Sequence, residues 1–168
     1  MRKLISILLS AVLLATPVFA VDLSDDQKGA ISMGCSSIKN SLSQLQKADA
    51  ASRSRIGTTY QTILTSYLTP MNLRLVKNGK LTTDLTSFVN DFTTTRANFN
   101  AQYVSYSRSL EELIAVDCQN NPDEFYEKLE HTREERAKLS SFVSEINKTL
   151  DAHMVAVSKL RSGRGQNV

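Results

Sequence analysis

The residues of this chain with the clearest potential for covalent chemistry are its two cysteines, Cys35 and Cys118. Two thiols can form a structural disulfide, a redox-active pair or bonds to another chain. No CxxC spacing is present, and Cys118 is expected at the C-terminal end of a helix, where no helix N-terminus would acidify its thiol. We therefore predict a structural disulfide within the chain. A redox-active pair and an intermolecular disulfide are the alternatives.

Histidines and carboxylates offer a second chemistry, metal binding. Glu127, His131 and Glu135 fall on one face of an expected helix, at i, i+4 and i+8. We interpret them, together with Glu134, as a solvated charged face, because the paired Glu-x-x-His motifs of di-iron bundles are absent. His131 and His153 lie about 33 Å apart along the same helix, which is too far to share a metal ion.

Motifs that would indicate catalysis are missing from the sequence. It has no GxSxG motif and no glycine-rich phosphate loop. Neither cysteine has a plausible catalytic histidine near it. We therefore predict no catalytic residue, no cofactor and no metal ion, and we expect that the protein is not an enzyme.

Residues 1–20 predict the compartment in which the cysteines function. An almost wholly apolar run from Leu4 to Ala15 follows a positive start, and small residues precede a cleavage position after Ala20. These are the parts of a secretory signal peptide. An uncleaved membrane anchor is the alternative, but the run is shorter than the roughly 18–20 residues of a spanning helix, and Pro17 interrupts it. We predict cleavage, export to the periplasm, the cell surface or the medium, and no stable membrane span afterwards.

Removal of this leader also changes the charge of the protein. The full chain has 20 Lys and Arg residues against 17 Asp and Glu residues. The leader contains Arg2 and Lys3 and no acidic residue, so the remaining chain is nearly neutral. A neutral chain has no general attraction to nucleic acid, and we expect no nucleic-acid partner.

The first long segment of helical periodicity begins at Ser24, whose hydroxyl is suited to cap a helix N-terminus. It ends at Asn78-Gly79, because glycine adopts the left-handed cap conformation easily. Pro70 lies within it and predicts a kink near Thr69 or a short last helix, Met71 to Val76. Its apolar residues, at three- and four-residue steps, are Ile31, Cys35, Ile38, Leu42, Leu45, Ile56, Tyr60, Ile63 and Tyr67.

Two further segments have the same periodicity. The second starts near Thr83 or Asp84, and the third starts at Asn121-Pro122 and ends near Ser162-Gly163. The apolar residues of the second are Leu81, Leu85, Phe88, Phe92, Phe99, Tyr103, Tyr106, Leu110 and Leu113, with a gap at Thr95. Those of the third are Phe125, Leu129, Leu139, Val143, Ile146, Leu150, Met154, Val157 and Leu160.

Three apolar stripes joined by two short turns predict an all-α fold. We expect one domain over residues 21–161, an elongated antiparallel three-helix bundle with coiled-coil-like spacing. The alternative is a four-helix arrangement in which the first segment splits at Pro70 or near Gly57. No strand is expected, and residues 162–168 are expected to be a disordered tail.

This topology predicts where the cysteines meet. Each lies about 40 residues from the Asn78-Gly79 turn, in opposite directions, so straight antiparallel helices bring them to about the same height. The disulfide would then close the open end of the first hairpin. A loop of this length corresponds to about 4 kcal/mol of stabilisation in the chain-entropy description.

The apolar stripes of the first and third helices are interrupted at matching heights. Asp49 and Arg53 stand at the interruption in the first helix, and Arg133 and Arg136 stand at that in the third. We predict that Asp49 faces Arg133 or Arg136, with the hydroxyl groups of Tyr103 or Tyr106 nearby. We interpret this polar core layer as a device that fixes helix register. A binding notch for an anion or a polar partner side chain is the alternative.

Several short segments resemble those of exported helical proteins from small-genome, candidate-phylum bacteria. They are Cys35-x-x-Ile38, Asp49-Ala50-x-x-Arg53, Pro70 to Leu75, and Asp117 to Tyr126. The resemblance implies export and helices and implies no activity.

From the sequence we expect a non-enzymatic bundle that acts by protein–protein contact at the cell envelope or surface, through a protein partner that the sequence does not identify. Two alternatives remain. One is an extracytoplasmic chaperone-like or stress protein, which would need an exposed apolar surface. The other is a binder of a small ligand or metal ion at the central polar layer, which would need a cavity there.

Overall fold

A computed structural model describes residues 23–80 and 83–162 of the chain. The expected leader lies outside these residues, as does the expected tail apart from Ser162, which belongs to the last helix. All regular elements of the described residues are helices, and none of these residues forms a strand. The predicted all-α class is therefore confirmed. None of the described helices is both long enough and apolar enough to cross a lipid bilayer.

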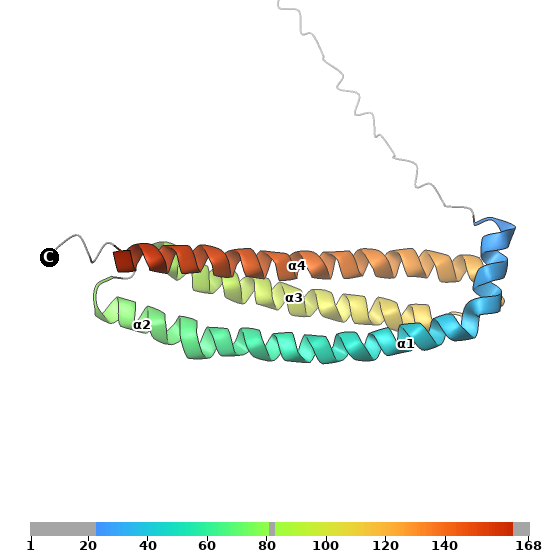
Figure 1. Cartoon of the computed structure of the whole chain (residues 1–168), viewed down its shortest axis with the longest axis horizontal. Coiled ribbons are helices and arrows are strands. Elements are labelled where there is room, and N and C mark those ends of the chain that lie inside the picture. The colour runs from blue at the N-terminus through green and yellow to red at the C-terminus, as the bar shows by residue number, and fades with distance from the viewer. Residues whose placement is uncertain (1–22, 81–82, 163–168) are drawn as a thin grey trace, which may run out of the picture.

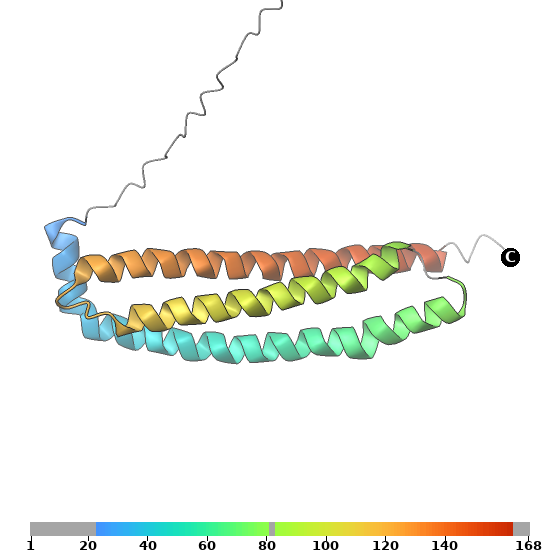
Figure 2. The ribbon, with the colours of Figure 1, turned by 180° about the vertical axis from the view of Figure 1, so that it is seen from behind.

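The helices form three rods that lie side by side in alternating directions (Figure 1 and Figure 2). The first rod is a continuous succession of α1 (Asp25–Thr62), a π-helical turn η1 (Ile63–Leu68) and α2 (Thr69–Lys77). The second rod is α3 (Thr83–Ala115), and the third is α4 (Pro122–Ser162). α3 packs against α4 more closely than either of them packs against the first rod. Because α1, η1 and α2 follow one another without a gap, the π-helical turn before α2 does not create a fourth rod.

The helix ends follow the predicted signals. The Ser24 hydroxyl oxygen accepts a hydrogen bond from the backbone N–H of Gln27, and the Gln27 side chain accepts one from the N–H of Ser24. Gly79 has a φ of 61°, the left-handed conformation that ends α2. Pro122 is the first residue of α4, where its missing N–H costs no helical hydrogen bond.

The proline in the first rod acts one turn earlier than predicted. A proline ring clashes with the carbonyl four residues before it, and a wider turn relieves the clash. Accordingly, the N–H of Thr69 bonds to the carbonyl of Leu64, five residues back. The extra residue rotates the inward face, so Leu68 is 4% exposed and Tyr67 is 66% exposed. The assignment of Tyr67 to the core was therefore wrong.

A second correction concerns the C-terminal part of α4. His153 occupies the inward position, 6% exposed, whereas the neighbouring Met154 is 70% exposed. The His153 ring stacks on the ring of Phe88 in α3, with ring centroids 3.9 Å apart. At this level of α4 the inward position belongs to His153, so Met154 is not the core residue that the periodicity predicted.

Two apolar clusters fill the bundle, one on each side of its middle. The cluster nearer the Gly79 turn contains the buried residues Tyr60, Leu68, Phe88, Phe92, Phe99 and Ile146. The cluster at the opposite end contains Tyr106, Leu110, Leu113, Val116, Cys118 and Phe125. Leu139 packs against both clusters. The polar residues considered below lie at the level between them.

The start of α1 bends across the ends of α3 and α4, as the blue ribbon in Figure 1 shows. This stretch places Ile31, Cys35, Ile38 and Leu42 against the cluster that contains Cys118. Cys35 and Cys118 form the predicted disulfide, with Cα atoms 5.5 Å apart. The prediction assumed straight helices, on which Cys35 and Cys118 would lie at slightly different heights. The bend of α1 brings the two residues to the same height. Within this stretch the Ser41 hydroxyl donates to the carbonyl of Ser37 at 3.0 Å, a bond that favours helix bending.

Loss of the disulfide should destabilise the protein without changing its fold. The double substitution Cys35→Ala with Cys118→Ala removes the covalent link and leaves no unpaired polar group. We expect a decrease of about 2–4 kcal/mol in the free energy of unfolding, measured by urea denaturation. Reduced wild-type protein is the control and should behave in the same way. Two free thiols in the exported protein, or an unchanged urea midpoint, would contradict the assignment.

Candidate functional site

A groove of about 520 Å³ opens between α1 and α4 at the middle of the bundle, and α3 forms its floor. We call it the central groove. It is lined from α1 by Asp49, Ser52, Arg53 and Ile56, from α3 by Phe99 and Tyr103, and from α4 by Arg133, Arg136, Ala137, Leu139, Ser140 and Val143. The four residues of the predicted polar core layer therefore line one site.

Small side chains explain why the bundle is open here. Ser52 on α1 and Ala137 and Ser140 on α4 stand on the groove walls, where larger apolar residues would bridge the two helices. Side chains of this size leave the space between the backbones unfilled, since interiors close only where side chains reach one another. The interruption of both apolar stripes in the sequence therefore corresponds to a groove in the structure.

Asp49 links all three rods at this level. Its Oδ2 accepts a hydrogen bond of 2.6 Å from the Tyr106 hydroxyl on α3, and its Oδ1 lies 3.4 Å from an Arg136 nitrogen on α4. Burial, and then the hydrogen bond to the Asp49 carboxylate, raise the pKa of Tyr106 well above its usual range. Tyr106 therefore remains a hydrogen-bond donor at physiological pH. The Asp49 side chain itself is 23% exposed, so the layer is reached by solvent from the groove.

The other two arginines do not pair with Asp49. The Arg53 guanidinium lies 5.2 Å from the centroid of the Tyr103 ring, a cation–π arrangement. Arg133 pairs with Glu130 on its own helix at 2.5 Å. Of the two partners that the sequence suggested for Asp49, the structure therefore selects Arg136.

A buried polar contact next to the groove was missed by the sequence analysis. Glu135 is 8% exposed and accepts hydrogen bonds from Gln102 on α3, at 2.7 Å, and from Lys138, at 2.6 Å. The bonds from Lys138 and Gln102 lower the pKa of its carboxyl group. The interpretation of Glu135 as part of a solvated face was therefore wrong. Glu135 lies on the side of α4 that faces α3, and this position indicated burial. The charge of its side chain had suggested exposure instead.

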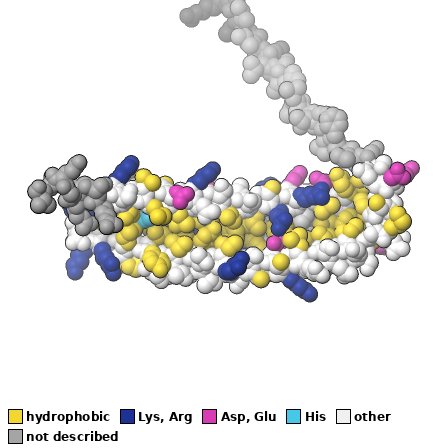
Figure 3. All heavy atoms as spheres, viewed as in Figure 1, with side chains coloured by type: hydrophobic (Ala, Val, Ile, Leu, Met, Phe, Trp, Pro, Cys, Tyr) yellow, Lys and Arg dark blue, Asp and Glu magenta, His cyan; other side chains and the backbone are white. Residues whose placement is uncertain are grey.

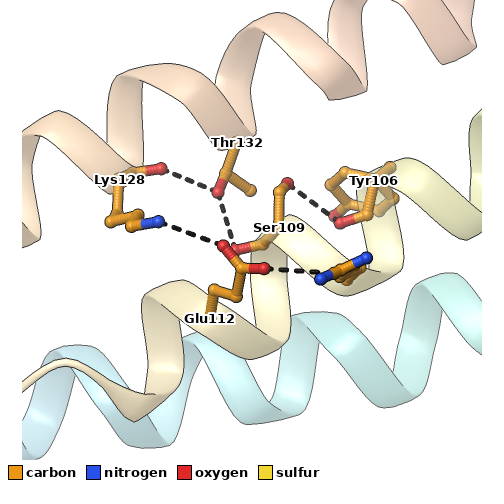
Figure 4. Close-up of polar contacts among 6 residues, drawn as sticks. Tyr106, Ser109, Glu112, Lys128 and Thr132 are labelled. Atoms are coloured by element: carbon orange, nitrogen blue, oxygen red, sulfur yellow. Dashed lines mark hydrogen bonds and ion pairs between the residues drawn. The ribbon is translucent and has the colours of Figure 1, made fainter.

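Further polar contacts join α3 to α4 toward the disulfide end (Figure 4). The hydroxyl of the buried Thr132 lies 3.1 Å from the Ser109 carbonyl and 2.8 Å from the Lys128 carbonyl. Glu112 pairs with Lys128 across the two helices at 3.0 Å, and Lys128 is the main cause of the lowered pKa of this carboxyl group. These contacts join α3 to α4, the helices that supply the groove floor and one of its walls.

His153 is a further polar residue that the bundle buries. Neither of its ring nitrogens has a hydrogen-bond partner among the described residues. Burial lowers the pKa of the imidazole, which therefore stays neutral against Phe88. His131, in contrast, is exposed. Within the described part of the chain, no three His, Cys, Asp or Glu side chains are grouped so that they could hold a metal ion.

The composition of the central groove defines what it is able to bind. Its apolar surface comes from Ile56, Phe99, Tyr103, Leu139 and Val143, and its charges are three arginines and one aspartate. Both carboxylate oxygens of Asp49 already have partners. The groove is therefore suited to a ligand that combines an apolar surface with a negative charge.

The Asp49–Tyr106 hydrogen bond should contribute measurably to stability. Asp49→Ala leaves the buried Tyr106 hydroxyl without its partner, which costs about 1–3 kcal/mol in the free energy of unfolding. Lys47→Ala, at an exposed position of the same helix, is the control and should cost less than about 0.5 kcal/mol. Adding Tyr106→Phe to Asp49→Ala should restore part of the loss. Equal unfolding midpoints for the two single variants would show that Asp49 is not part of the structural layer.

His153 should make the protein less stable at mildly acidic pH. Because burial lowers its pKa, the unfolded chain binds a proton that the folded chain does not, so the free energy of unfolding falls as pH decreases below about 6.5. The carboxyl groups with lowered pKa values lose their contribution only at lower pH, below about 4.5. Urea midpoints at pH 7.5, 6.5 and 5.5 measure the effect, and His153→Phe should flatten it. Identical pH profiles for the two proteins would disprove the assignment.

Comparisons with protein-family models, with curated proteins and with solved structures give no match to this chain. No activity or ligand can therefore be transferred from a relative. The function has to be inferred from the geometry of the central groove and from the surface around it.

Proposed function

We propose that this chain is an exported, non-enzymatic, coiled-coil-like helical bundle that acts by protein–protein contact at the cell envelope or surface, with the central groove as its contact site. The observation that carries the proposal is the opening between α1 and α4, which leaves Tyr103 on its floor and Ile56, Leu139 and Val143 on its walls partly exposed in the middle of the bundle. The disulfide supports export, since such bonds persist in oxidising compartments.

The apolar surface extends beyond the groove itself. Figure 3 shows a band of hydrophobic side chains along this face of the molecule, between α4 and the first rod. On α4, Met154 lies about five helical turns after Arg136 and therefore on the same face, and it is 70% exposed. An apolar band of this length, rimmed by polar residues, is typical of a surface that binds another protein.

A small-ligand binder is the second candidate, because Asp49, Arg53, Arg133 and Arg136 all line one cavity of ordinary ligand-site size. The continuation of the band along α4 favours a longer partner. A chaperone-like role would need this surface to accept many unrelated sequences, and the charged centre of the groove favours a selective contact instead.

Site-specific photo-crosslinking in the source cells tests the proposal. The photoreactive residue replaces Ser140, which lines the groove, or the neighbouring Ser141, which is also exposed but does not line it. The two positions differ by about 100° around the helix axis. We expect the Ser140 variant to form one discrete protein adduct, and the Ser141 variant to form the same adduct in much lower yield.

Three results would contradict the proposal. Adducts of equal yield at Ser140 and Ser141 would indicate contact that does not involve the groove. A continuous smear of adducts would favour the chaperone-like alternative. No protein adduct at Ser140 would leave the small-ligand alternative.

A further inference from the structure

We propose that the occupant of the central groove is an acidic amphipathic helix of a partner protein, which lays apolar side chains on the groove floor and places a carboxylate against Arg53. This inference rests on the proposed function and specifies the chemistry of the partner. It follows from three properties of the groove: its direction, its charge, and the poor fit of the occupants that this chain itself could supply.

The direction of the groove matches a helix. The groove walls follow helical periodicity on both sides, with Asp49, Ser52, Arg53 and Ile56 at i, i+3, i+4 and i+7 on α1. Arg133, Arg136, Ala137 and Ser140 repeat the same spacing on α4. The floor residues Phe99 and Tyr103 are one turn apart on α3. A helix laid parallel to these walls would bring its own i, i+3, i+4 and i+7 side chains onto them, as in other helix-in-groove complexes.

The charge of the groove selects the sign of the partner. Among the described residues, no carboxylate lies within 4 Å of Arg53. The Tyr103 ring holds its guanidinium at the edge of the groove, and guanidinium groups bind carboxylates through two parallel hydrogen bonds. Arg133 and Arg136 add positive charge on the opposite wall, where Arg133 pairs with Glu130, which does not line the groove, and Arg136 pairs with Asp49 across it. The α1 wall is formally neutral, since it holds Asp49 as well as Arg53, and the α4 wall is positive, so a partner carboxylate beside Arg53 would meet a net positive charge from the groove as a whole.

A second copy of this chain is a poor occupant. In a symmetric dimer the same surface faces itself across a twofold axis. Two central grooves brought face to face would bring together linings that each hold three arginines and one aspartate, so their net charges have the same sign. Juxtaposed like charges disfavour such a contact.

The N-terminal part of the chain is also a poor occupant on grounds of charge. Residues 1–20 contain two basic residues, Arg2 and Lys3, and no acidic one. This segment could supply apolar side chains but no carboxylate for Arg53. A partner of opposite charge therefore fits the groove better than either occupant from this chain.

Two helical peptides serve as probes for the test. Both are 21-residue heptad designs with leucine at the a and d positions, one with glutamate and the other with lysine at the e and g positions. Binding to the purified exported protein is measured by fluorescence anisotropy at two salt concentrations. We expect the glutamate peptide to bind at least about tenfold more tightly than the lysine peptide, with a difference that shrinks at high salt.

Matched variants locate the contact. Arg53→Gln should weaken binding of the glutamate peptide by about three- to fivefold, whereas Arg55→Gln, on the same helix but outside the groove, should leave it unchanged. Ser140→Trp fills the groove and should abolish binding, whereas Ser141→Trp should not. Circular dichroism verifies that each variant is folded.

Defined outcomes overturn the inference. Equal affinity for the two peptides, equal effects of Arg53→Gln and Arg55→Gln, or no binding of the glutamate peptide would each contradict an acidic helix as the occupant. A stable dimer in sedimentation velocity would assign the groove to a second copy, and Arg53-dependent binding of laurate without peptide binding would assign it to a small anionic amphiphile. In the first three cases a discrete crosslink at Ser140 would still support the proposed function, so the two failures are distinguishable.

Discussion

The structure depends on how the first rod is attached to the other two. α3 and α4 pack closely, joined by Glu112–Lys128 and the contacts of Thr132, whereas the first rod packs less closely against them. The Cys35–Cys118 disulfide fixes this rod at one end, and the short turn at Gly79 fixes it at the other. With both ends fixed, the middle of the rod does not need a continuous apolar seam. The protein is therefore able to have small and charged residues there and still hold α1 beside α4.

Asp49 makes this open middle compatible with a defined arrangement of the helices. An aspartate in a groove wall would otherwise be an unpaired charge beside an apolar floor, which is unfavourable. Its two oxygens instead bond to Tyr106 on α3 and Arg136 on α4, so a single carboxylate links all three rods. The same arrangement leaves Arg53 without a carboxylate. The residues that fix the structure and those available to a partner are thus different members of one polar layer.

Much of the fold could be predicted from the sequence because its signals are local or follow from chain length. Ser24, Gly79 and Pro122 determine helix ends through their own backbone chemistry, and the distances along the helices bring Cys35 and Cys118 together. The height of Asp49 relative to Arg136 follows from the same geometry.

What could not be predicted depends on contacts between helices. The π-helical turn before Pro70 rotates the inward face, so Leu68 replaces Tyr67 in the core. His153 and Glu135 are buried because Phe88 and Gln102 on α3 receive them, and their polarity alone indicated the surface. The interrupted apolar stripes form a groove because of the distance between the helix backbones, which the sequence does not specify.

Hydrogen exchange measured by mass spectrometry before and after disulfide reduction is the most direct test that the disulfide holds the first rod against α3 and α4. We predict that reduction accelerates exchange in α1, including the groove wall, while α3 and α4 stay protected. Unchanged exchange, or equal acceleration in all three rods, would contradict the role of the disulfide as the anchor of the first rod.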